Sequence, residues 1–205
     1  MRPPRLQLCL GLFALAAGIA DPTARAQSGP DGTATNDDVV AGLLANRPRG
    51  ERVLIMPKLF ESLTDVSTEQ TAKSTPAGMA AWRDTFGKDG DDEYALRQFF
   101  VPMKAWQKQT AEDLLDEAAK QLTEGSGTVL LAKKKYELDG CPCRSFLLRH
   151  PETGKWIRVD YLVIYPDLFT VSYTGTVAGI QNSKVVGFFN GLKTAPAPAP
   201  KPAAP

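Results

Sequence analysis

Hydrophobic and polar residues alternate along much of the second half of the chain, a pattern typical of β-strands with one buried face. The clearest example is residues 156–165, where every odd position from 157 onward is isoleucine, valine or tyrosine. The even positions change from Arg158 and Asp160 to Leu162 and Ile164. A strand whose second face becomes apolar is expected to enter a region that is covered on both faces.

Similar patterns, bounded by turn residues, predict further strands along the chain. Turns rich in glycine, proline or aspartate are expected at residues 75–78, 88–91, 139–140, 151–154 and 166–167. The predicted strands cover residues 52–56, 65–74, 79–86, 94–101, 128–138, 144–150 and 168–173. Because short turns join consecutive strands, we expect antiparallel meanders, with residues 136–175 at the centre of the sheet.

One strongly amphipathic helix is predicted over residues 111–122. Its apolar side chains recur at intervals of three and four residues and form one continuous face. Thr110 is expected to cap its first turn, with Asp113 completing a capping box, and the glycine-containing residues 124–127 end it.

Two shorter helices are predicted at the ends of the domain. The first begins at Asn36 and ends before Pro48. The second is capped by Ser183, and its expected packing face consists of Val185, Val186, Phe188, Phe189 and Leu192.

The two ends of the 205-residue chain are not expected to join the fold. Residues 1–26 combine a basic start, an apolar run and an Ala24-Arg25-Ala26 triplet, which together predict a secretory signal peptide. Residues 195–205 are mostly alternating alanine and proline, which predicts an extended, disordered tail because proline cannot donate to a sheet ladder. Residues 27–50 are then a flexible lead-in with a short helix, and residues 51–194 form a single α/β domain.

The formal charge does not point to a charged partner. Removing residues 1–26 takes away three arginines and one aspartate, so the balance moves from +1 (24 − 23) to −1 (21 − 22). A nearly neutral exported domain gives no case for nucleic acid or anionic lipid. No other apolar stretch is long enough to span a bilayer, so no transmembrane segment is expected after signal cleavage.

The local motif with chemistry of its own is Cys141-Pro142-Cys143. In an oxidising compartment, two thiols one residue apart can form a strained, reducible disulfide, or can bind Cu(I) as soft ligands. The structural interpretation, which we prefer, is a clip at the mouth of the 139–140 hairpin, or two buried or partner-linked thiols. His150 lies seven strand steps beyond Cys143, roughly 23 Å away, so we expect no shared metal site.

The other polar groups are interpreted as structural. Three lysines at residues 133–135 point alternately to opposite faces of a strand and are expected to mark a protected sheet edge. Ser145, Asp160 and His150 are not expected to converge, which disfavours a hydrolase triad. The acidic face of the predicted 111–122 helix is expected to be solvated; it consists of Glu112, Asp113, Asp116 and Glu117.

Six motifs follow one another between residues 57 and 193. They are T-P-A-G at 75–78, the amphipathic helix, L-D-G-x-P at 138–142, P-E-T-G at 151–154, R-V-x-Y-L-V at 158–163 and F-F-x-x-L at 188–192. In this order the chain resembles the fold shared by the photosystem II extrinsic protein PsbP, the Ran-binding protein Mog1 and bacterial DcrB-like envelope proteins. The resemblance implies an α+β fold, an α/β/α sandwich whose antiparallel sheet carries helices on both faces. Where bacterial relatives have an aromatic residue and a glycine around the proline, this chain has Cys141 and Cys143.

We therefore expect a periplasmic or secreted, non-enzymatic binding or accessory domain of the cell envelope. No cofactor is expected, and the partner would be another envelope protein or a small ligand. The alternative is an envelope thiol–disulfide or copper-handling protein that uses Cys141 and Cys143. A third hypothesis, a hydrolase that uses acidic residues, needs a cleft that brings carboxylates together.

Overall fold

The computed structural model describes residues 41–42, 47–75, 78–101 and 103–199. The predicted signal peptide and the end of the proline-rich tail lie outside these residues. Of the helix predicted from Asn36, only residues 41–42 are described, and they are helical.

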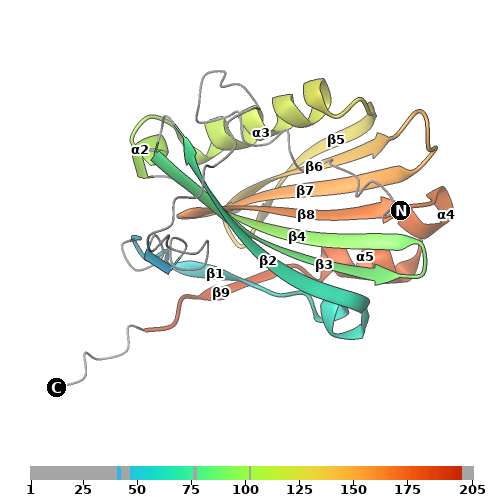
Figure 1. Ribbon diagram of the computed structural model, residues 1–205, viewed down its shortest axis with the longest axis horizontal. Coiled ribbons are helices and arrows are strands. Elements are labelled where there is room, and N and C mark those ends of the chain that lie inside the picture. The colour runs from blue at the N-terminus through green and yellow to red at the C-terminus, as the bar shows by residue number, and fades with distance from the viewer. Residues whose placement is uncertain (1–40, 43–46, 76–77, 102, 200–205) are drawn as a thin grey trace, which may run out of the picture.

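Most of the described chain forms one antiparallel sheet (Figure 1). Its seven strands lie in the order β2-β3-β4-β8-β7-β6-β5, so two meanders join where β4 pairs with β8. The strands predicted in this region are confirmed, with ends that move by a few residues. They are β2 (Thr64–Thr75), β3 (Gly78–Asp89), β4 (Asp92–Phe100), β5 (Val129–Leu138), β6 (Cys141–Arg149), β7 (Trp156–Ile164) and β8 (Asp167–Gly175).

The tightest turn follows directly from its residues. Asp139 and Gly140 join β5 to β6, and both have positive φ, 51° and 80°. A two-residue type I′ hairpin needs positive φ at both positions, and Asp-Gly is among the pairs that adopt it most readily. The first residues of β6, including both cysteines, are placed by this turn.

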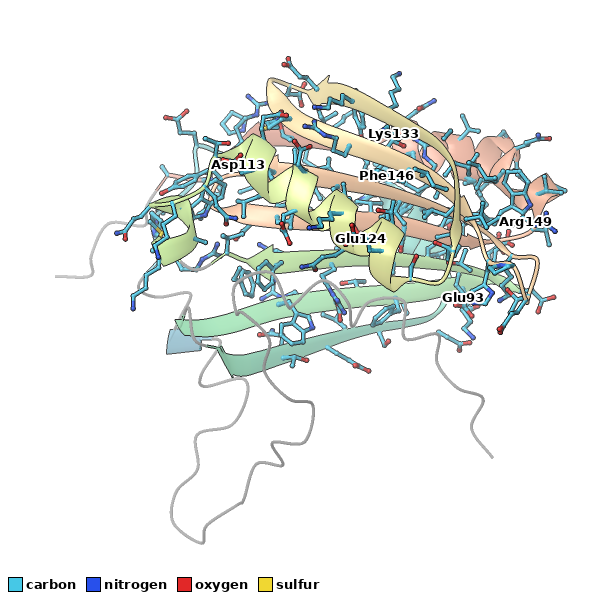
Figure 2. The ribbon with its side chains drawn as sticks, turned by 90° about the horizontal axis from the view of Figure 1, so that it is seen from above. Glu93, Asp113, Glu124, Lys133, Phe146 and Arg149 are labelled. Carbon is cyan, nitrogen blue, oxygen red and sulfur yellow. The ribbon has the colours of Figure 1, made fainter. Side chains whose placement is uncertain are left out.

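One face of the sheet is covered by α3 (Ala111–Gly125). Thr110 and Asp113 form the predicted capping box, in which the Asp113 N–H donates to Thr110 Oγ1 at 3.2 Å. The buried helix residues Leu114, Leu115, Ala118 and Leu122 pack on the sheet. Figure 2 looks onto this face, with Asp113 and Glu124 marking the ends of α3 and Phe146 on the sheet beside it.

The opposite face buries an aromatic cluster beneath α5 (Ser183–Asn190) and the 3-10 turn η2 (Lys58–Ser62). Asn182, one residue before the predicted cap, accepts from the Lys184 N–H and begins α5. Val186 is exposed, so it does not belong to the packing face, whereas the other predicted residues are buried. From residue 47 onward, two short helices, α2 (Met103–Trp106) and α4 (Val177–Ile180), complete the described helical elements.

A separate two-stranded ribbon pairs β1 (Arg52–Ile55) with β9 (Lys193–Pro196) on the α5 side of the sheet (Figure 1). The tail was predicted to be disordered from residue 195, and this is wrong for its first three residues. Ala195 and Pro196 belong to β9, and the Ala197 N–H donates to the Glu51 carbonyl at 2.8 Å. Pro196 is tolerated because alternate residues of a strand turn their nitrogens away from the neighbouring strand.

The predicted α/β/α sandwich is also wrong. The chain is β-rich, built on a seven-stranded antiparallel sheet with a few short helices. A sandwich needs a helical layer on each face. Here one face carries a single long helix, and the other is covered by eight-residue α5, η2 and the β1–β9 ribbon. None of the helices in the described residues is long and apolar enough to cross a membrane.

Candidate functional site

The two cysteines lie on the same face of β6, because strand residues two apart point in the same direction. Cys143 is completely buried in the aromatic cluster under α5, and Cys141 packs against that cluster while staying partly exposed. Both are free thiols, and the Cys143 thiol donates to the Cys141 carbonyl oxygen at 3.3 Å. The arrangement fits the structural interpretation of the motif, in which at least one thiol is a core residue.

Burial also makes these thiols poor nucleophiles. It raises the pKa of Cys143 from its ordinary value of 9.0 to about 12, and it raises the pKa of Cys141 as well. The thiolate, rather than the thiol, attacks disulfides and binds soft metals. At neutral pH, therefore, very little of either side chain is in its reactive form.

His150 lies at the far end of β6, in the turn that leads to β7. Its carbonyl accepts from the Gly154 N–H at 2.9 Å, and its Nδ1 accepts from the Thr153 N–H at 3.3 Å. His150 is therefore a turn residue, one position beyond the end of β6 at Arg149. Across the described ranges, no three histidine, cysteine, aspartate or glutamate side chains come together in a way that could hold a metal ion.

The acidic face of α3 is tied to the sheet by one arginine. Arg144 on β6 is buried, and its guanidinium pairs with Glu112 and with Asp116, the latter at 3.1 Å. Asp113 is used by the capping box, whose hydrogen bonds from Thr110 lower the pKa of that carboxyl. Glu112 and Asp116 therefore attach the helix to the sheet, and Asp113 fixes its start.

Ser145 and Asp160 do meet, contrary to the sequence-based expectation. Ser145 Oγ donates to Asp160 Oδ1 at 2.6 Å, and Tyr136 Oη donates to Asp160 Oδ2 at 2.8 Å. Arg158 adds two hydrogen bonds of 3.2 Å to the same carboxylate. His150 is not part of this group, so no triad forms. The cluster joins β5, β6 and β7 through one buried, fully paired carboxylate.

A pocket that the sequence did not predict lies between the segment leading into β1 and the turn from β7 to β8. Its volume is about 500 Å³. Residues 47–50 and 52–54 form one wall, residues 164–167 form the other, and Gln98 and Phe169 contribute from the sheet. Ligand pockets commonly measure roughly 300–1,000 Å³, so this one is large enough for a small molecule.

Close packing and hydrogen bonds hold the two walls together. Gly50 lies directly against the Tyr165 carbonyl oxygen, and a Cβ at this position would overlap that oxygen. Arg47 donates to the Pro166 carbonyl at 3.2 Å, and Trp106 Nε1 donates to the same carbonyl at 3.1 Å. The walls of the pocket are thus held in place by Gly50 and by two partly buried side chains, Arg47 and Trp106.

The charges in the pocket are unequal. Its lining includes three arginines, Arg47, Arg49 and Arg52, but one acidic residue, Asp167, which gives a formal excess of +2 (3 − 1). Asp167 pairs with Arg47 and accepts from Gln98 Nε2 at 2.7 Å. Burial raises the pKa of Asp167 even beside Arg47, which marks this end of the pocket as poorly solvated.

The signal for this pocket was present in the sequence but could not be interpreted alone. Residues 47–52 read R-P-R-G-E-R, a basic stretch around a glycine. The opposite wall is about 115 residues further along the chain, and only the tertiary fold brings the two together. From the sequence, residues 47–50 were predicted to end a lead-in and Arg52 to begin a strand.

Comparisons with known proteins add little to this geometry. No family model matches the chain, and no curated protein matches it. Among solved structures, it is similar to the crystal structure of PA94 from Pseudomonas aeruginosa, a protein of unknown function. The two share 16% sequence identity with a TM-score of 0.38, over 68% of this chain and 89% of that chain. At this similarity, neither the fold nor the function of one follows from the other.

Proposed function

We propose that the chain is an exported, non-enzymatic binding domain of the cell envelope and that the arginine-lined pocket is its binding site. The observation that carries the proposal is the pocket itself, about 500 Å³ between two walls that are fixed by close packing. The signal-peptide pattern of residues 1–26 supports export. The resemblance of residues 57–193 to PsbP, Mog1 and DcrB-like proteins, a largely non-enzymatic group, supports binding.

The polar clusters also favour binding over catalysis. The Asp160 carboxylate is fully paired with strand neighbours, and Arg144 holds two carboxylates of α3. A general acid or base must reach a substrate, and its pKa must suit proton transfer. These carboxylates are used in attaching one element of the fold to another.

A bulky side chain at Val53 is expected to abolish ligand binding. Val53 lies on β1, lines the pocket and is 39% exposed, so tryptophan there can fill the pocket without entering the core. The test is a thermal-shift screen of chemically varied small molecules against the wild-type chain and Val53→Trp. Compounds that stabilise the wild type are expected to lose their effect on the variant.

Ile55→Trp is the matched control. Ile55 is two residues further along β1, on the same side of the strand, and is 46% exposed, but it does not line the pocket. The Ile55→Trp variant should bind every compound as the wild type does. If the stabilising compounds act equally on Val53→Trp, or if none stabilises the wild type, the pocket is not the binding site.

The alternative, a thiol–disulfide or copper-handling function, makes a different prediction about reactivity. Because the pKa of Cys143 is raised to about 12, its thiol should react with an aromatic disulfide reagent at neutral pH at least about a hundredfold more slowly than in the unfolded chain.

The raised pKa of Cys143 also makes the stability of the fold depend on pH. The unfolded thiol ionises from about pH 9 while the folded one stays neutral, so this contribution to stability is lost as pH rises from 9.0 toward 12.

Thiol counting before and after addition of urea measures this reactivity, and Cys143→Ala identifies the slow residue. Rapid reaction of both thiols in the folded chain, or stoichiometric binding of Cu(I) by the pair, would favour the redox or copper function over the proposal.

A further inference from the structure

We propose that the ligand of the pocket is a small organic anion, whose carboxylate or phosphate group pairs with Arg49. This rests on the proposed function, because it assigns a ligand class to the same pocket. The argument starts from the formal excess of positive charge among the lining residues, three arginines against Asp167. A cationic ligand would be repelled, and an anionic one attracted.

Two of the three arginines already have partners within the fold. Arg47 pairs with Asp167, donates to the Pro166 carbonyl, and its guanidinium lies 4.7 Å from the centre of the Phe100 ring. Arg52 donates to Thr194 Oγ1 at 2.5 Å and lies 3.5 Å from the Asp139 carboxylate. These two side chains hold the walls of the pocket and the ribbon in place.

Arg49 differs from both. It is exposed and lines the pocket, and it makes no ion pair with any residue in the part of the chain that the structure describes. A guanidinium carries five donors in a planar fork that matches the two oxygens of a carboxylate or phosphate. Arg49 is therefore the side chain whose hydrogen-bonding groups are available to a ligand.

The remaining lining favours an apolar body on that anion. Val53, Leu54, Ile164 and Phe169 line the pocket, and so does Tyr165, whose ring lies edge-on to Trp106 with centroids 5.0 Å apart. An apolar lining with a few placed polar groups is the usual composition of a small-molecule site. A single aromatic ring carrying one anionic group matches both parts of this lining.

The test uses three probes that share a ring and differ in charge. Benzoate carries a carboxylate, phenyl phosphate a phosphate, and benzamide is the neutral counterpart of benzoate. Binding to the purified chain is measured by isothermal titration at low and high salt. At least one anion is expected to bind at low salt and more weakly at high salt, while benzamide binds at least about tenfold more weakly. Which anion binds more tightly distinguishes a carboxylate ligand from a phosphate ligand.

Arg49→Gln should weaken binding of the preferred anion by about tenfold to a hundredfold, because a charge-assisted pair is lost. Arg149→Gln is the matched control: it removes the same charge from an exposed residue at the far end of β6 (Figure 2) and should bind as the wild type does. Circular dichroism establishes that both variants are folded.

The outcomes separate the two proposals. If benzamide binds as tightly as benzoate, and Val53→Trp blocks both, the ligand class is wrong while the pocket remains a binding site. If neither anion binds the wild-type chain, or if Arg49→Gln binds them as tightly as the wild type does, the inference is overturned. The proposed function fails separately, in the thermal-shift screen, if the stabilising compounds act equally on Val53→Trp or if no compound stabilises the wild type.

Discussion

Replacing Asp160 with alanine is expected to lower the free energy of unfolding by about 3–5 kcal/mol. The Asp160 side chain is only 1% exposed and accepts hydrogen bonds from Tyr136, Ser145 and Arg158. Its removal leaves two hydroxyl groups without their acceptor. It also leaves the Arg158 guanidinium, which lies 3.9 Å from the centre of the Phe189 ring, without its counter-charge. Removing one partner of a buried pair costs far more than the pair itself contributes.

Urea denaturation measures this loss, and Asp89→Ala is its control. Asp89 pairs with Lys184 at 2.6 Å, but both side chains are well exposed, at 47% and 36%. An exposed pair of this kind contributes less than about 1 kcal/mol. Equal, small losses in the two variants would mean that the Asp160 cluster does not stabilise the junction of β5, β6 and β7.

Replacing Gly179 with alanine should cost about 1–3 kcal/mol through overpacking. A Cβ at Gly179 would overlap the Tyr173 hydroxyl and meet Asp92 Oδ2 at 3.1 Å. Tyr173 cannot easily move aside, because it is completely buried and packs edge-on against Tyr94 with ring centroids 5.3 Å apart. The absence of a side chain at Gly179 is therefore a condition for seating α4 on the aromatic cluster.

Two further variants isolate the cause. Gly187→Ala places the same methyl group in α5, where no atom outside the neighbouring helix backbone lies within 4 Å of it. This variant should be neutral or stabilising because alanine favours helix over glycine. Combining Gly179→Ala with Tyr173→Phe removes the overlapping hydroxyl and should recover most of the loss seen in thermal unfolding. If the double variant is as unstable as the sum of the two single ones, the overlap is not the reason.

The sheet was predictable because its signals are local. Three of these signals depend on residues close together in sequence, and each was confirmed. They are the alternation of apolar and polar residues, the Asp139-Gly140 turn and the Thr110–Asp113 capping box. The change from Arg158 and Asp160 to Leu162 and Ile164 correctly indicated a strand that becomes covered on both faces.

What could not be predicted depends on distant parts of the chain. Residues 193–196 become a strand because residues 52–55 lie beside them, and proline made that pairing look improbable. The meeting of Ser145 with Asp160 depends on the register between β6 and β7. The buried state of Cys143, which decides its chemistry, depends on α5 and the aromatic cluster covering that face.

The candidate site shows the same division. The Cys141-Pro142-Cys143 motif was visible in the sequence, yet its environment makes it a poor thiolate site. One wall of the arginine-lined pocket, residues 47–52, has a basic pattern that can be recognised in the sequence. The opposite wall, residues 164–167, has no such pattern. The distance between these walls in sequence is the reason that the pocket appears only in the folded chain.

The most direct test of the pocket is a titration of the isotope-labelled chain with the more tightly binding of benzoate and phenyl phosphate, followed through its backbone amide chemical shifts. If the pocket is the binding site, the changes will concentrate at Arg49, Gly50 and Val53 on one wall and at Tyr165 and Asp167 on the other. Changes centred instead on Cys141 and Cys143, or on the edge strand β5, would contradict the assignment of the binding site to this pocket.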